Sequence, residues 1–177
     1  MMVVRGHTLF IADAAVHERP SADDLAHIAT ASAAAARRLG HKPRVALLSY
    51  SNFGNPQGVV VEVMREAKRL LDVAAHDGAI DFEFDGEMSV DVALEGERAK
   101  AYPFCNLSGP ANVLVMPGLH AAAISTRLVR RFGTATAIGP MLIGVEKPVQ
   151  IVSMDATVSD LVQMALMAAH ASAPKLL

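Results

Sequence analysis

The feature that most constrains the fold is a short apolar run between two turns. Residues Ala111 to Met116 form this run, with Gly109-Pro110 before it and Pro117-Gly118 after it. A near-continuous apolar run bounded by glycine and proline is typical of a strand that is covered on both faces of a sheet. The sequence therefore predicts a central strand here, with layers packed on both sides of it.

A helix is expected directly after this strand. Ile124, Leu128 and Phe132 recur at helical spacing, and Gly133 stands where a helix commonly ends. Ligands of open α/β sheets bind outside the carboxyl ends of such strands. The turn from Met116 to His120 is therefore a candidate wall of a binding site.

The remaining chain alternates in the same way between apolar runs and amphipathic stretches. Buried strands are expected at residues 8–15, 44–50 and 148–152, and helices at 21–40, 59–78 and from Thr157 to Pro174. Ile80 to Phe84 alternates apolar and acidic side chains, which predicts an exposed or edge strand, and Asp85-Gly86-Glu87 is expected to turn the chain. Residues 90–102 are expected to be helical in part, although Gly96 weakens that helix.

This alternation predicts one α/β domain over residues 1–177, a three-layer αβα sandwich around a largely parallel sheet. The glycines within the apolar stretch 137–145 indicate close approach of another backbone or of a ligand. The turn at 51–56 precedes a helix and so is a candidate phosphate cradle. It carries neither of the common glycine-rich phosphate motifs, and a plain turn is the favoured interpretation.

Composition excludes several functional classes. A net charge of −2 and the lack of any Lys/Arg run longer than two argue against nucleic acid or an anionic membrane as partner. No apolar stretch approaches the roughly 18 residues of a spanning helix, and no signal peptide is evident, so we expect a cytoplasmic protein. Cys105 is the single cysteine and is expected to be a small buried thiol, and the seven histidines are scattered. We therefore expect no metal site.

Several stretches together resemble the phosphate acetyltransferase family. They are Tyr102-Pro103-Phe104, residues 109–117, Ile138-Gly139-Pro140 and residues 146–152, with Phe10 to Asp13, Val45 to Ser51 and Asp85 to Met88 upstream. The motifs at residues 102–105, 115–118 and 147–152 look most like those of the phosphate-acetyltransferase-like domain at the C-terminus of bacterial NADP-dependent malic enzymes. The resemblance covers almost the whole chain, which corresponds to about the second half of the family domain.

The resemblance implies more than the residues alone do. It implies a fold akin to isocitrate/isopropylmalate dehydrogenases, a homodimer or larger oligomer formed through this half, and acetyl-CoA or CoA as the ligand. In the malic enzymes, such a domain senses acetyl-CoA, while the malate-oxidising chemistry lies in a separate catalytic domain of the parent chain.

The resemblance also assigns roles near the C-terminus. Active members carry Ser-Arg-Gly after their last strand and an aspartate six residues after the arginine; the matching positions here are Ser153, Met154, Asp155 and Asp160. By resemblance, Ser153 would hydrogen-bond the reacting groups and Asp160 would be the base that deprotonates CoA. Met154 offers no charge and no fork of donors, so bidentate recognition of the acyl phosphate is lost.

A second departure lies in the ligand-binding group Ile138, Gly139 and Pro140, where Ile138 replaces a tyrosine that active members often carry. Structural interpretations compete with the functional ones. An acid three residues after Thr157 caps a helix in any protein, and a serine at a strand exit usually satisfies a turn. Asp160 and Ser153 can therefore each be interpreted as a structural residue or as a functional one.

Two losses in one site favour an acyl-CoA-sensing regulatory and oligomerisation domain that has lost catalysis. The alternative is an active phosphate acetyl/butyryltransferase, which Ser153 and Asp160 would support. A third hypothesis is a module that only assembles its parent protein.

Overall fold

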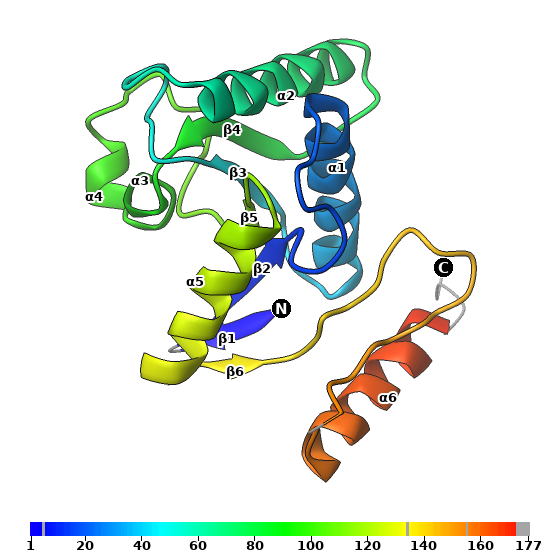
Figure 1. Ribbon diagram of the computed structural model, residues 1–177. Coiled ribbons are helices and arrows are strands. Elements are labelled where there is room, and N and C mark those ends of the chain that lie inside the picture. Colours follow the sequence, from blue (N-terminus) through cyan, green and yellow to red (C-terminus); the bar gives the residue numbers. More distant parts are fainter. Residues whose placement is uncertain (5, 134, 155, 173–177) are drawn as a thin grey trace.

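The computed structural model describes residues 1–4, 6–133, 135–154 and 156–172. Its middle layer is a six-stranded sheet in the order β4-β3-β5-β2-β1-β6 (Figure 1). The strands are β1 (Met2–Val4), β2 (His7–Ala12), β3 (Arg44–Leu48), β4 (Glu83–Met88), β5 (Val113–Val115) and β6 (Thr136–Ala137). The helices are α1 (Ala22–Arg38), α2 (Val59–His76), α3 (Val90–Leu94), α4 (Gly96–Ala99), α5 (Leu119–Phe132) and α6 (Val158–Ser172).

The sheet is largely parallel, as the sequence predicts. Strands β4, β3, β5 and β2 run parallel, and only β1 pairs antiparallel with its neighbours β2 and β6. Alternate strand residues pack into two separate cores: Val45 and Leu47 face α1 and α2, whereas Ala46 and Leu48 face α3 and α5. Helices therefore cover both faces, and the expected three-layer αβα architecture is confirmed.

The predicted central strand is β5, which lies between β3 and β2. Its three residues Val113, Leu114 and Val115 are all buried, and they face the two cores in turn. Short strands covered on both faces need no polar side chain, which is why this run is continuously apolar. The helix after it begins at Leu119 as expected.

Most other predicted elements are present with shifted ends. The strand expected at 8–15 stops at Ala12, because the Asp13 carboxylate accepts backbone N–H groups from Ala15, Val16 and His17 and so folds a turn. The first long helix starts with the expected serine cap as a complete capping box. The partly helical stretch 90–102 divides into α3 and α4. Strands β1 and β6 are too short to give a sequence signal, and we did not predict them.

The edge strand predicted from residues 80–84 is present as β4 at the edge of the sheet, but its range differs from the prediction. It spans Glu83–Met88, so Asp85-Gly86-Glu87 lies within the strand and does not turn the chain. The Asp85 and Glu87 side chains are only 3% and 1% exposed. Within the alternating segment 80–84, Asp81 is exposed as expected, whereas Asp85 and Glu87, which we expected in a turn, are buried against loops.

Hydrogen bonds from those loops explain the burial. Asp85 accepts the N–H of Asn106 at 2.6 Å, and Glu87 accepts the hydroxyl of Ser51 at 2.8 Å and the N–H of Gly54. Carboxylates that accept several hydrogen bonds can be buried at low cost. The acidic residues of β4 therefore fasten two loops to the sheet.

The strand expected at 148–152 is absent. This segment forms a single isolated bridge, between Met141 and Gln150, and the side chains of Val149 and Ile151 are about half exposed. The segment has the β-branched residues of a strand, but one bridge gives it no sheet neighbour to pack with.

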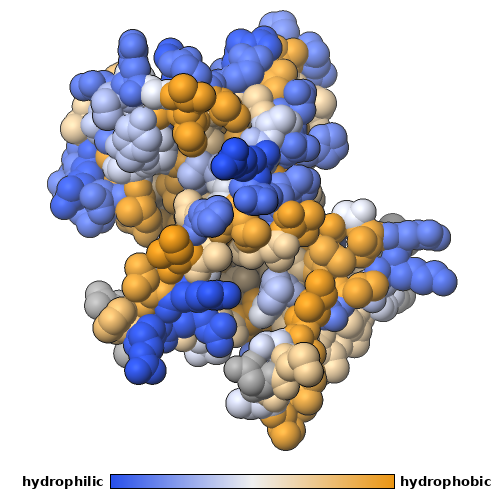
Figure 2. Space-filling model, viewed as in Figure 1, coloured by the Kyte–Doolittle hydropathy of each residue, from blue (hydrophilic) through white to orange (hydrophobic). Residues whose placement is uncertain are grey.

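Helix α6 lies apart from the sheet, at the end of an extended segment (Figure 1). We expected Leu161, Met164, Ala165 and Ala168 to form its buried face; Met164 is buried, whereas Leu161 is 49% exposed. Figure 2 shows apolar side chains gathered over α6 and the segment before it. Pro174, expected to end this helix, lies outside the described residues. Among the helices described, none combines the length and the apolar content needed to cross a bilayer.

The apolar stripe that indicates α5 is also exposed. Ile124, Leu128 and Phe132 are 59%, 52% and 84% exposed, while the buried side of this helix is formed by Ala122. The helix prediction is therefore right, but the stripe does not face the sheet.

Replacing Gly86 with Ala should strongly destabilise the protein. The residue has φ +148°, and an added Cβ would lie 2.7 Å from the carbonyl oxygen of Leu47 on the neighbouring strand. We expect a loss of about 3 kcal/mol or more in unfolding free energy, measured by urea denaturation. The control is Gly96→Ala, where an added Cβ meets open space. Equal stability of the two variants would contradict the packing described for β4.

The Glu83 carboxyl should contribute to acid stability. Hydrogen bonds from Lys42 and Ser108 lower the pKa of Glu83 from 4.5 to about 2. A lowered folded-state pKa stabilises the protein above pH 4.5, and this contribution disappears as the pH falls toward 2. Glu83→Gln should therefore be less stable than the wild type at pH 7, with the difference closing near pH 2. The exposed Glu146→Gln variant should show no such pH-dependent difference in thermal unfolding.

Candidate functional site

A cavity of about 390 Å³ lies between the end of α5, strand β6 and the start of α6. Its lining includes four residues of the predicted site: Ile138, Gly139, Ser153 and Asp160. The other lining residues are Arg127, Arg130, Ala137, Val152, Ala156, Thr157, Gln163 and Met164. The structure therefore brings together residues that are more than 20 positions apart in the sequence.

Two predicted residues do not line this cavity. Pro140 is absent from its walls, and the Met154 side chain is fully exposed to solvent. Asp155, which occupies the position of the family glycine, lies outside the described residues. The position where the resemblance implies a phosphate-binding arginine thus carries a thioether that does not line the cavity.

Backbone contacts hold the β6 side of the cavity. Ala137 pairs with Met2, and the Ile138 N–H donates to the carbonyl of Met1 at 2.9 Å. Gly139 has φ +130°, and a Cβ on it would come within 2.9 Å of the backbone nitrogen of Met141. This crowding comes from the glycine's own segment, while the nearest atom of another segment, the nitrogen of Met1, would lie 3.7 Å from that Cβ.

Asp160 forms a complete capping box at the start of α6. Its Oδ2 accepts the N–H of Thr157 at 2.9 Å and the Thr157 hydroxyl at 2.7 Å, and its own N–H donates back to that hydroxyl. These hydrogen bonds, with a smaller contribution from the charge of Arg130, lower the pKa of Asp160. The structural interpretation is therefore confirmed. A general base works best with a pKa near the operating pH, and the geometry moves Asp160 away from that value.

Ser153 lies in a turn at the mouth of the cavity. Its carbonyl accepts the N–H of Ala156 at 3.1 Å, as expected of a serine that precedes a helix cap. Its side chain is one of those that line the cavity. Its role toward a ligand stays a prediction.

Arg127 and Arg130 are lining residues that we did not predict. They lie on α5 at i, i+3 spacing, which places them on one side of the helix. They are the only basic side chains among the lining residues of the cavity. The sequence does show basic residues on the helix that follows the central strand. We did not assign them to a site, because basic positions on a helix usually indicate a solvated face.

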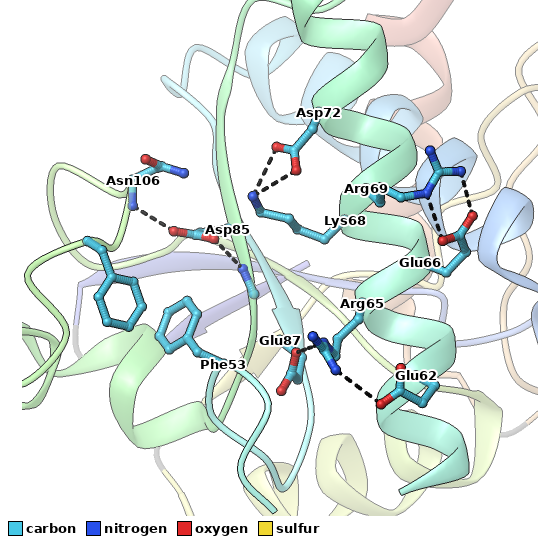
Figure 3. Close-up of a pocket in the computed structure, with 12 residues that line it drawn as sticks. Phe53, Glu62, Arg65, Glu66, Lys68, Arg69, Asp72, Asp85, Glu87 and Asn106 are labelled. Carbon is cyan, nitrogen blue, oxygen red and sulfur yellow. Dashed lines mark hydrogen bonds and ion pairs between the residues drawn. The ribbon is translucent and has the colours of Figure 1, made fainter. Parts of the chain in front are cut away.

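A second and larger cavity, of about 710 Å³, lies between α2, β4 and the loop around Phe104 (Figure 3). The three basic residues of α2 that line it each pair with a carboxylate of the same helix: Arg65 with Glu62, Lys68 with Asp72 and Arg69 with Glu66. Asp85 and Glu87 form its floor. The three basic groups are balanced by three carboxylates, so the α2 side of this cavity carries no net positive charge.

The contacts of Glu87 at the second cavity bear on the prediction that the turn at 51–56 could bind a phosphate. Glu87 accepts the N–H of Gly54 and the hydroxyl of Ser51, and its carbonyl accepts the N–H of Phe53. A carboxylate therefore occupies the donors that a phosphate would need. The plain-turn interpretation is the one that the structure supports.

Other candidate features contribute nothing to either cavity. The predicted wall from Met116 to His120 lines neither of them. Cys105 is half-buried, and this burial raises the pKa of its thiol, which opposes a nucleophilic role. Within the parts of the chain that the structure describes, no group of three or more His, Cys, Asp or Glu side chains could hold a metal ion.

Comparison with known proteins agrees with this fold and with the family resemblance. The family model for phosphate acetyl/butaryl transferase matches residues 1–169. An NADP-dependent malic enzyme from Rhizobium meliloti (strain 1021) is 52% identical over 166 residues, which cover 94% of this chain and 21% of that protein. A phosphate acetyltransferase from Clostridium acetobutylicum is 39% identical over 158 residues, which cover 88% of this chain and 46% of that protein.

Solved structures give the same result. The EutD phosphotransacetylase from Staphylococcus aureus superposes with a TM-score of 0.89 at 31% identity, over 96% of this chain and 52% of that chain. The chain thus spans about a fifth of the length of the malic enzyme relatives and about half of this phosphotransacetylase.

Proposed function

This chain belongs to the phosphate acetyl/butaryl transferase family, and on that basis we propose that it is an acyl-CoA-binding regulatory domain of an NADP-dependent malic enzyme. In this proposal, acetyl-CoA or CoA binds at the cavity beside α6, and the domain catalyses no acyl transfer. The catalytic domain of the malic enzyme is its partner within the parent chain.

The observation that carries the proposal is the position of Met154. Its side chain is fully exposed, whereas Ile138, Gly139, Ser153 and Asp160 line one cavity. Acyl transfer from a phosphate needs a cation aimed at the charge that develops during attack, and removal of one such group typically costs on the order of 100- to 1,000-fold in rate. A cavity that keeps the neighbouring residues but has no arginine at position 154 is suited to binding without turnover.

Asp160 supports the same conclusion. The hydrogen bonds from Thr157 lower the pKa of its carboxyl, so it holds a proton less readily than an ordinary aspartate. A base of this kind draws a proton from the CoA thiol only weakly. The geometry that stabilises α6 therefore works against catalysis.

A transferase is the second candidate, because Ser153 and Asp160 line the same cavity. The two functions differ in a direct assay. We expect calorimetry to detect acetyl-CoA binding to this chain, and we expect no acetyl-CoA formation from acetyl phosphate and CoA. Met154→Arg alone should not create turnover, because catalytic groups that act as a unit do not restore activity one at a time.

Two outcomes would contradict the proposal. If the wild type forms acetyl-CoA and the Asp160→Asn variant does not, the transferase becomes the better supported function. The regulatory role is measured on a polypeptide that joins this domain to a malic enzyme domain, where saturating acetyl-CoA should change the rate of malate oxidation. An unchanged rate of malate oxidation would contradict the regulatory role.

We also propose that the domain forms a dimer or a larger oligomer. Large apolar side chains are exposed along α5, where Ile124 and Leu128 share one face, and on α6, where Leu166 is 64% exposed. Apolar surface of this kind usually marks an interface.

Sedimentation should detect this assembly at micromolar concentrations. The double substitution Ile124→Glu with Leu128→Glu should shift the protein toward the monomer, because it places charges within the interface. Val73→Glu, at an exposed apolar position on α2, is the matched control and should leave the assembly unchanged. A wild-type protein that is monomeric throughout this range would refute the proposal.

A further inference from the structure

The larger cavity, between α2, β4 and the loop around Phe104, takes no part in the function proposed above. We infer that it binds a short aliphatic diamine, a ligand with two ammonium groups joined by a hydrocarbon chain. The cavity shares no lining residue with the one beside α6, so the two sites are separate. Three of its properties point to this ligand: its charge, an open carboxylate oxygen on its floor and two aromatic rings in its wall.

The cavity carries an excess of negative charge. Its lining includes three basic side chains and five carboxylates, which gives a formal charge of −2. The three basic residues of α2 pair with three acidic residues of the same helix and so balance them. The two carboxylates that remain are those of Asp85 and Glu87, on the floor of the cavity. A ligand that balances them carries two positive charges.

The Glu87 carboxylate has one oxygen open to the cavity. Its Oε1 accepts the hydrogen bonds from Ser51 and Gly54, whereas Oε2 accepts none from the residues that the structure describes. Arg65 Nε lies 4.0 Å from Oε2, which is beyond hydrogen-bond distance, and the same guanidinium donates to Glu62 at 3.1 Å. Since a buried carboxylate is stabilised by each donor that it gains, an ammonium group beside Oε2 would be bound favourably.

Asp85 provides the second anchor. Its Oδ1 accepts the N–H of Gly86 and its Oδ2 accepts the N–H of Asn106, so each oxygen has one hydrogen bond and room for another. Two residues further along a strand, the chain has advanced by at most about 7 Å. Asp85 and Glu87 both project from β4 toward the cavity (Figure 3). One short, extended diamine can therefore reach both carboxylates.

Two phenyl rings in the wall suit the rest of such a ligand. Phe53 and Phe104 lie edge to face with their centroids 5.0 Å apart, and Phe104 is 63% exposed. Aromatic faces attract ammonium groups and pack against methylene groups. A metal ion would gain little from such a wall, and within the described ranges no cluster of three or more His, Cys, Asp or Glu could hold one. An organic cation is the ligand class that uses both the carboxylates and the rings.

The site is tested by calorimetry on this chain with three probes: 1,4-diaminobutane, the shorter 1,2-diaminoethane and the monoamine butylamine. The floor variants are Asp85→Asn and Glu87→Gln, which keep a carbonyl oxygen for the loop hydrogen bonds. Asp81→Asn is the matched control, because Asp81 is an exposed carboxylate just before β4 that does not line the cavity. Thermal unfolding checks that each variant is folded.

Two further variants change exposed parts of the cavity, so they report on the site even if the floor variants do not fold. They are Phe104→Ala and Arg65→Gln. Phe104→Ala should weaken binding of 1,4-diaminobutane several-fold, because it removes one ring. Arg65→Gln should strengthen it, because it removes the cation closest to Glu87 Oε2 and leaves the cavity more negative.

We expect 1,4-diaminobutane to bind the wild type, and the other two probes to bind at least about tenfold more weakly because neither reaches both carboxylates with an ammonium group. Each floor substitution should weaken binding of 1,4-diaminobutane by about tenfold, as is typical of charge-assisted hydrogen bonds. Asp81→Asn should bind as the wild type does.

Other outcomes would overturn the inference. If butylamine binds as tightly as the diamine, the cavity recognises a single ammonium group, such as that of a lysine on a protein partner. If Asp81→Asn weakens binding as much as Glu87→Gln does, the diamine is attracted by the general surface charge. Unchanged binding in both Phe104→Ala and Arg65→Gln, or no binding to the wild type at millimolar concentration, would also refute it. None of these results bears on acetyl-CoA binding at the cavity beside α6.

Discussion

The structure depends on the burial of β5 between β3 and β2. Val113 and Val115 face one core and Leu114 faces the other, so helices must cover both sides of the sheet. Full burial of such a side chain is worth about 1.5–3 kcal/mol each. The turn at Pro117-Gly118 then directs α5 back along one face of the sheet, and this path brings Arg127 and Arg130 to the cavity beside α6.

The candidate site lies where the structure has the fewest constraints. Helix α5 packs on one core through its single buried residue Ala122, and α6 reaches the cavity through an extended segment with a single strand-like bridge. The capping box of Thr157 and Asp160 defines where α6 begins, and Met164 is its one buried residue. Both helical walls of the cavity therefore have few buried contacts. A ligand that contacts both walls is well placed to change how they are arranged, as a regulatory domain requires.

The sequence predicts the layers of this fold well, because buried strands and capped helices have strong local patterns. The apolar run 111–116 and the serine cap at residue 21 are examples of this. Sequence reasoning placed β4 at the sheet edge but was wrong for the turn expected at 85–87, since the sequence does not reveal that Asp85 and Glu87 accept hydrogen bonds from distant loops. It was wrong in the same way for residues 148–152, where a β-branched pattern cannot show that a pairing neighbour is missing.

The candidate site was predicted only in part. The resemblance identified Ile138, Gly139, Ser153 and Asp160, and the structure places all four on one cavity. The arginines of α5 were missed, because helical spacing does not show which basic residues face a cavity closed by a segment some 25 residues later.

The central claim is that acetyl-CoA binds at the cavity between α5, β6 and α6. Amide hydrogen exchange, measured with and without saturating acetyl-CoA, tests it most directly. The account predicts slower exchange in the second half of α5, in β6 and in the first turns of α6, with unchanged exchange in α2. Protection confined to α2 and β4, around the larger cavity, would contradict it.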